Sequence, residues 1–225
     1  MTGRGWLAPR LLGPWLFATV LLATVLLAAC APPSSVRFAP VDIEAYGHWH
    51  RSEYARIHRR WTRHRHLTKD FTTTLDVHAT LLGDEFRAAY LAEVTALRRL
   101  TPVQHTALAQ DLRSAGDRWV EVILEMVTSN WRWNDLTSPR SVWTLTLADD
   151  AGHVVAVAEV ASVPEKSDTL EALFPPVTPF TRGWRVRFPR VLADGTILLG
   201  PNTRTLTLRF AGALGSTDLR WENRP

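Results

Sequence analysis

The sequence predicts an α+β fold in which N-terminal helices are followed by an antiparallel β-sandwich of immunoglobulin-like size. Between residues 42 and 118, outside one alternating segment, apolar side chains recur every three or four positions, which is the helical period. From residue 119 to 225, short runs of alternating apolar and polar residues are separated by turn signals, as is typical of a sandwich. The chain has one cysteine, Cys30, so no internal disulfide can stabilise the fold and packing must do so.

Three helices and one strand are expected before residue 119. The aromatic and basic segment that begins at Asp42 has helical spacing, and the threonine-rich segment after it alternates strictly, as a half-buried strand does. Thr101 and Gln104 have the spacing of a capping box, which begins the last helix. The expected elements are a helix over 42–69, a strand over about 71–81, and helices over 83–100 and 101–116.

The second half of the chain is expected to contain only strands. The segment 119–128 also fits helical spacing, but its β-branched residues favour a strand. We therefore predict a helix-rich part over 42–118 with one strand, and a β-sandwich over 119–225 that shares one core with it. The remaining strands are expected at 142–148, 154–161, 184–188, 204–210 and 218–222.

The first 29 residues have the layout of an export signal. They carry Arg4 and Arg10 and no acid, and their apolar run over 15–29 is too short to span a bilayer comfortably. Secretory signals end in a small-x-small cleavage site. In this chain the corresponding small residues lead directly into Cys30.

The tetrapeptide Leu27-Ala28-Ala29-Cys30 resembles the lipobox of bacterial prolipoproteins. The resemblance implies that the Cys30 thiol receives a diacylglyceryl group, that cleavage follows Ala29, and that the new amine accepts an acyl chain such as palmitate. Residues 1–29 would then be a lipoprotein signal peptide, and the proline- and serine-rich residues 30–41 a tether. Two alternatives stay open: an ordinary signal peptide with a chance cysteine, or an uncleaved membrane anchor that ends near Ala31.

Three stretches of the body, 85–90, 133–136 and 186–189, resemble uncharacterised bacterial envelope lipoproteins. This resemblance implies no activity. Lipidation itself would place the protein outside the cytoplasm, in the cell envelope, where nucleic acid is excluded as a partner. Ala31 follows the cysteine in place of the aspartate associated with inner-membrane retention, which favours the outer membrane.

A strongly basic segment follows the expected tether. Between residues 51 and 69 its only acid is Glu53, whereas the net charge of the whole chain, +4, argues for no particular partner. A lysine or arginine near an anionic membrane contributes about 1 kcal/mol of attraction. We therefore expect this segment to contact anionic lipid or an acidic envelope polymer. The residues concerned are Arg51, Arg56, Arg59, Arg60, Arg63, Arg65 and Lys69.

Histidines are also concentrated near this segment: His48, His50, His58, His64 and His66. A metal ion needs two or more imidazoles that converge on one point. On a helix, residues two apart such as His64 and His66 point to different sides, so they cannot hold one ion together. A site would require a second element that contributes Asp76 or His78. We therefore expect no bound metal and no cofactor.

The familiar catalytic motifs are missing, so no residue is a candidate for catalysis. Glu121 and Glu125 lie about 13 Å apart if their segment is a strand, which is too far for glycoside hydrolysis. Trp131 and Trp133 could form a sugar-binding platform, although packing against the core is favoured. The expected function is a non-enzymatic structural or interaction role in the envelope. A carbohydrate or cell-wall binding module is the alternative, and an envelope hydrolase ranks third.

Overall fold

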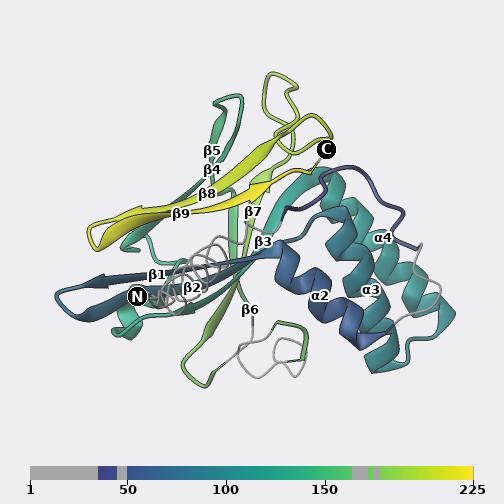
Figure 1. Cartoon of the computed structure of the whole chain (residues 1–225), viewed down its shortest axis with the longest axis horizontal. Helices are drawn as coiled ribbons and strands as arrows, with labels where there is room; N and C mark the ends of the chain where they lie inside the picture. The colour runs from purple at the N-terminus through teal and green to yellow at the C-terminus, as the bar shows by residue number, and fades with distance from the viewer. Residues whose placement is uncertain (1–34, 45–49, 164–171, 175–177, 225) are drawn as a thin grey trace, which may run out of the picture. The chain divides into compact units, whose positions relative to one another are not determined.

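The computed structural model describes residues 35–44, 50–163, 172–174 and 178–224. Within these ranges the chain is a mixed α and β protein with three α-helices and two antiparallel sheets (Figure 1). Residues 34–225 form a compact unit, and most of its buried apolar side chains belong to one cluster. A core of its own is the property expected of a part that folds by itself.

The three helices lie side by side, although β1 and β2 separate α2 from α3 in the sequence (Figure 1). They are α2 (Arg51–Trp61), α3 (Asp84–Arg98) and α4 (Pro102–Arg118). The expected capping box is present at the start of α4, where the Gln104 amide donates to Thr101 Oγ1 at 3.3 Å and the Thr101 amide donates to Gln104 Oε1 at 2.9 Å. Among the described residues, no helix is long and apolar enough to span a membrane.

The larger sheet has five strands in the order β1-β2-β3-β7-β6, and every neighbouring pair is antiparallel. Its central strand β3 is buried over most of its length, as its run of apolar residues requires. The strands are β1 (Thr62–Lys69), β2 (Thr72–Leu81), β3 (Trp119–Val127), β6 (Glu159–Val163) and β7 (Arg182–Pro189).

The smaller sheet has four strands in the order β5-β4-β8-β9. The strands are β4 (Trp143–Asp149), β5 (Val154–Ala156), β8 (Thr205–Gly212) and β9 (Gly215–Glu222). A short 3-10 helix, η1 (Trp131–Asn134), lies in the connection between β3 and β4.

One face of the five-stranded sheet supplies much of the core. Because side chains alternate along a strand, Val77, Leu124 and Val186 share this face, and all three are fully buried. They belong to the same apolar cluster as Leu208 and Trp221 of the smaller sheet. The opposite face carries the polar residues of the same strands and lies toward the helices, so the polar side chains described below gather there.

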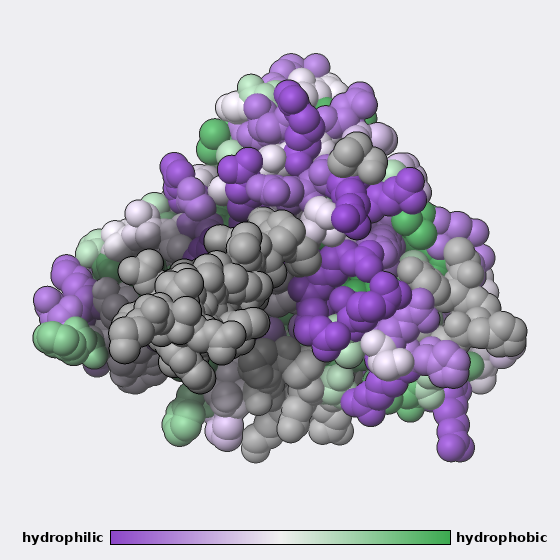
Figure 2. Space-filling view, in the orientation of Figure 1, coloured by the Kyte–Doolittle hydropathy of each residue, from purple (hydrophilic) through white to green (hydrophobic). Residues whose placement is uncertain are grey.

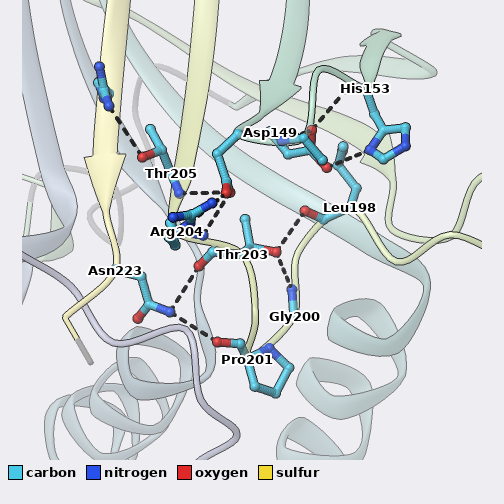
Figure 3. A network of polar contacts seen from close by, with 12 residues as sticks. Asp149, His153, Leu198, Gly200, Pro201, Thr203, Arg204, Thr205 and Asn223 are labelled. Carbon is cyan, nitrogen blue, oxygen red and sulfur yellow. Dashed lines mark hydrogen bonds and ion pairs between the residues drawn. The ribbon is translucent and has the colours of Figure 1, made fainter.

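A polar network fixes the loop that leads into β8 (Figure 3). The Asp150 carboxylate accepts hydrogen bonds from the Arg204 and Thr205 amides at 2.7 and 3.1 Å. Thr203 Oγ1 donates to the Leu198 carbonyl at 3.2 Å, and Asn223 Nδ2 donates to the Thr203 carbonyl at 2.9 Å. The loop is thus tied to both the β4–β5 turn and the end of β9.

The start of the compact unit is paired with its end. Val36 and Asn223 form a parallel bridge, in which the Val36 amide donates to the Glu222 carbonyl at 2.9 Å. Val36 and Phe38 are both buried in the core. The expected tether over 30–41 therefore extends too far, because its last residues contain two apolar side chains that pack against the domain.

The expected helix over 42–69 is wrong in its second half. Helix α2 ends at Trp61 and the chain continues directly into strand β1, which pairs with β2 along its whole length. The helical spacing of residues that continued to His64 was coincidental. After Trp61 the conformation of the chain is determined by its pairing with β2. The part before residue 119 consequently contributes two strands, and both belong to the five-stranded sheet with β3.

The expected strand over 154–161 is divided between the two sheets. Strand β5 pairs with β4, whereas β6 pairs with β7. Residues 157–158 carry the chain from one sheet to the other. A continuous alternating pattern cannot reveal such a crossing, because both halves keep the same period. The other expected strands and helices are present within a few residues of their expected bounds.

Candidate metal centre

A cluster of imidazole and carboxylate groups lies where β1 pairs with β2. In this register His64 is directly opposite His78, and His66 is directly opposite Asp76. Residues two apart on a strand point to the same face, so all four side chains share the polar face of the sheet. We call these four residues, His64, His66, Asp76 and His78, the histidine–aspartate cluster.

The side chains of the cluster are in close contact. His64 Nε2 lies 2.7 Å from Asp76 Oδ1, and His66 Nδ1 lies 3.4 Å from the other carboxylate oxygen of Asp76. The rings of His64 and His78 are stacked, with centroids 4.2 Å apart and an interplanar angle of 15°. One potential ligand atom from each of His64, Asp76 and His78 lies within 4.8 Å of the others.

These distances are compatible with a single bound ion. Two atoms held at 2.0–2.1 Å from one tetrahedral ion are about 3.4 Å apart, so modest side-chain rotations would close the present separations. Three imidazoles and one carboxylate are a donor set that suits zinc and other late first-row ions, whereas magnesium and calcium prefer oxygen ligands alone. Among the described residues, His64, Asp76 and His78 are the group placed closely enough to serve.

The cluster is open to solvent on one side and closed on the other. The side chains of His64, His66 and Asp76 are 50, 45 and 35% exposed. His78 is half-buried, and burial, helped by nearby His64, lowers its pKa against the opposing influence of Asp76. The lowered pKa favours the neutral imidazole of His78, which has a nitrogen lone pair available for coordination.

The cluster could also have a purely structural role, as a set of hydrogen bonds across the β1–β2 pair. Asp76 alone could hold His64 and His66 by hydrogen bonds, but an exposed ion pair contributes only about 0–1 kcal/mol. His153 and Asp149 form such a simple pair elsewhere in the chain, with Nδ1 2.7 Å from Oδ2. The histidine–aspartate cluster differs from it because two further imidazoles, from different strands, face the same carboxylate.

The structure thus changes the interpretation of the histidines. His64 and His66 lie on a strand, where a separation of two residues places them on one face, and Asp76 and His78 supply the second element that a site requires. His58 does not belong to this cluster. It is buried between Thr62 and Thr80, with Nε2 3.4 Å from each hydroxyl, and burial lowers its pKa to about 4. His50 precedes α2, and His48 lies outside the described residues.

The two tryptophans considered as a sugar-binding platform, Trp131 and Trp133, both lie in η1. Trp131 is 70% exposed, and the Arg132 guanidinium lies 5.6 Å from its ring centre. Trp133 is half-buried, and its carbonyl accepts a hydrogen bond from Trp143 Nε1 at 3.0 Å. Trp131 is therefore largely exposed, against the expected packing, whereas Trp133 is only partly exposed.

The basic segment is divided between two elements. Hydrophilic side chains gather over α2 (Figure 2), where Arg60 pairs with Glu85 at 2.7 Å. On β1, Arg63 points to the other side of the sheet, donates to the Arg220 carbonyl at 2.7 Å and lies over the Trp221 ring. Arg59, Arg65 and Lys69 are exposed. The expected contact with anionic lipid stays a prediction.

Cys30 and the cleavage position after Ala29 lie outside the described residues.

The two glutamates of β3 are confirmed as residues of one strand, but they do not form a pair. Glu121 binds Arg87 at 2.8 Å and Arg187 at 2.7 Å. Glu125 is buried, and neither of its carboxylate oxygens has a hydrogen-bond partner among the described residues. With nothing to stabilise the charge, burial raises the pKa of Glu125 to about 8.

No protein-family model and no curated protein sequence matches the chain. Among solved structures, the chain is similar to a protein of unknown function from Burkholderia pseudomallei K96243. The two share 10% sequence identity with a TM-score of 0.37, and the match covers 84% of this chain and 93% of that one.

Proposed function

We propose that this chain is a lipid-anchored protein of the bacterial cell envelope whose extracytoplasmic domain binds a divalent transition-metal ion, in a non-enzymatic structural or interaction role. The single observation that carries metal binding is the convergence of His64, Asp76 and His78 from two paired strands. His66 would add a ligand from the exposed side. The placement in the envelope, with the outer membrane favoured, rests on Cys30 and the residues before it.

The proposal also takes the two antiparallel sheets as the halves of a β-sandwich, with the helices on the outer, polar face of the larger sheet. In this arrangement the histidine–aspartate cluster lies outside the sandwich core. An ion could then enter from solvent without disturbing the packing between the sheets.

Metal binding can be tested by calorimetry on residues 34–225, titrated with zinc and, separately, with magnesium. We expect one zinc ion per chain and no magnesium binding, because imidazole ligands favour zinc. The substitutions His64→Gln and His78→Gln should each weaken zinc binding at least about tenfold. His153→Gln is the matched control, since it removes an imidazole from a simple aspartate pair and should leave the zinc affinity unchanged.

Equal affinity for zinc in the wild type and in the His64→Gln, His78→Gln double variant would reject the proposed site. Thermal unfolding of each variant shows whether the domain remains folded, so that a loss of binding is not confused with a loss of structure.

The lipid anchor is tested separately, in cells that express the full chain with an alkyne-labelled fatty acid. The wild type should take up the label and stay with the membrane fraction, whereas Cys30→Ser should do neither. Labelling that persists in Cys30→Ser would disprove anchoring through this cysteine.

Glycan binding through η1 is the second candidate, and the exposure of Trp131 favours it. Aromatic faces beside polar groups are suited to sugar rings. Retention of cell-wall glycan by wild-type protein, and its loss in Trp131→Ala and Trp133→Ala, would support this role. Unchanged retention in both folded variants would eliminate it.

A further inference from the structure

A pocket lies between the polar face of the five-stranded sheet and helices α3 and α4. Its volume is about 310 Å³, which is at the lower end of the range for small-molecule sites. Most of its wall is apolar. The lining includes Tyr90 of α3, Leu108 and Leu112 of α4, Ile123 of β3, and Phe174.

Helix α4 lies over this pocket with few buried contacts. Of its described side chains only Ala109 is buried, together with Gly116, whereas Leu108 and Leu112 are half-exposed and line the pocket. A helix in a soluble domain normally buries its apolar stripe against its neighbours. The unfilled space under α4 therefore leaves apolar surface that a ligand of matching chemistry would cover.

Glu121 and Arg187 of the pocket wall are paired with each other and with two residues outside the lining, Arg87 and Glu159. Arg87, Glu121, Arg187 and Glu159 form a chain of ion pairs in which the N–O distances are 2.8, 2.7 and 2.9 Å. Two cations and two anions are thus matched. Asp111 also lines the pocket and is exposed.

Arg185 also lines the pocket and is not part of these ion pairs. Arg185 lies directly opposite Ile123 of β3. It is two residues from Arg187 along β7, so both arginine side chains lie on the same face of the sheet as Glu121. The Nε of Arg185 is buried and has no hydrogen-bond partner among the described residues. A buried donor that is left unsatisfied costs about 1–3 kcal/mol, and more when the group is charged. An anion in the pocket would remove this cost.

Tyr90 offers a second donor in the same wall. Burial raises the pKa of its hydroxyl, and nearby Arg98 and Arg185 only partly offset this effect. The hydroxyl therefore keeps its proton at neutral pH and can donate a hydrogen bond. A neutral donor in the same wall as the Arg185 guanidinium suits an anionic head group.

We infer that this pocket binds a monoanionic amphiphile, of which a medium-chain carboxylate is the simplest example. Its head group would accept from Arg185 and Tyr90, and its chain would lie along Leu108, Leu112 and Ile123. The buried Arg185 Nε, which has no partner among the described residues, favours an anionic head group, and the apolar wall selects a hydrocarbon chain over a sugar. This site is independent of the histidine–aspartate cluster, since the two share no residue.

The inference can be tested by calorimetry on residues 34–225 with three ligands of equal chain length: decanoate, 1-decanol and decyltrimethylammonium. We expect wild-type protein to bind decanoate at least about tenfold more tightly than decanol, because a hydrogen bond to a charged group contributes about 1.5–3 kcal/mol. The cationic ligand should not bind. Arg185→Gln should reduce decanoate affinity to the level of decanol and leave decanol affinity unchanged.

Two further variants complete the test. Arg140→Gln removes an exposed arginine outside the pocket and should bind decanoate as the wild type does. Ala115→Trp fills the pocket from α4 and should abolish the binding of decanoate and decanol alike. The inference fails if wild-type protein does not bind decanoate, if folded Arg185→Gln retains wild-type affinity for it, or if the cationic ligand binds equally well. His64→Gln should not alter decanoate binding, so failure here is distinguishable from failure of the metal proposal.

Discussion

Replacing the buried glutamate of β3 should change how the stability of the domain depends on pH. Glu125 is 2% exposed, and its carboxylate oxygens have no partner among the described residues, so the folded protein keeps the carboxyl protonated. Its pKa is about 8 in the folded protein, compared with an ordinary value of 4.5. Glu125→Gln keeps the shape of the side chain and cannot ionise.

The magnitude follows from the difference between the two pKa values. An acid whose pKa is raised by folding releases a proton on unfolding, at any pH between about 4.5 and 8. Wild-type stability is therefore fully present below 4.5 and declines as the pH rises to 8. At 1.36 kcal/mol per pKa unit, the loss is roughly 5 kcal/mol in total and about 3 kcal/mol by pH 7.

The assay is urea unfolding followed by tryptophan fluorescence at pH 5, 7 and 8.5, with a chelator present so that metal binding does not contribute. Glu125→Gln and the wild type should be similarly stable at pH 5, and the variant should be more stable by several kcal/mol at pH 8.5. The exposed Glu44→Gln serves as control, and its difference from the wild type should stay constant. A constant difference for Glu125→Gln as well would refute the reasoning, because it would mean that Glu125 ionises normally in the folded protein.

Three other substitutions should destabilise the domain, as measured by urea unfolding at pH 7. Gly83→Ala would place a Cβ 2.2 Å from a ring carbon of the fully buried Trp61, and such overpacking costs about 1–3 kcal/mol; a stable variant would show that the ring can move. Arg87→Met would remove one partner of the buried Glu121, at a cost of about 3–5 kcal/mol, and adding Glu121→Gln should recover part of the loss. Thr101→Ala removes the cap of α4 and should cost about 1 kcal/mol, whereas Thr101→Ser should cost little.

Local signals in the sequence predicted much of the fold. The capping box of Thr101 and Gln104 depends on residues three apart, and the alternation of β2 depends on its own buried face. Strand β1 was missed because it is an edge strand with exposed residues on both faces, so it carries no apolar period. Its turn residues, Asp70 and Phe71, have φ values of 50° and 60°, although they lack the glycine that marks most such hairpins.

Predicting the candidate sites would have required recognising strand β1 and knowing which residues pair between neighbouring strands. His64, His66, Asp76 and His78 are 14 positions apart at most in sequence, but only the pairing of β1 with β2 brings them together. A signal was available in the alternation of histidine and arginine from Arg63 to His66, which is the period of a strand. The position of Arg185 beside Glu121 and its partners could not be predicted, because it follows from the register of β3 with β7.

The bridge between Val36 and Asn223 has a practical consequence for labelling experiments. A fluorophore or reporter fused at either end of the compact unit would report on nearly the same point of the molecule. Joining the two ends with a short linker and opening the chain at the exposed turn around Gly152, where φ is 93°, should give a circular permutant that keeps all the strands. Such a permutant would present the histidine–aspartate cluster and the pocket unchanged while moving both ends to the β4–β5 turn.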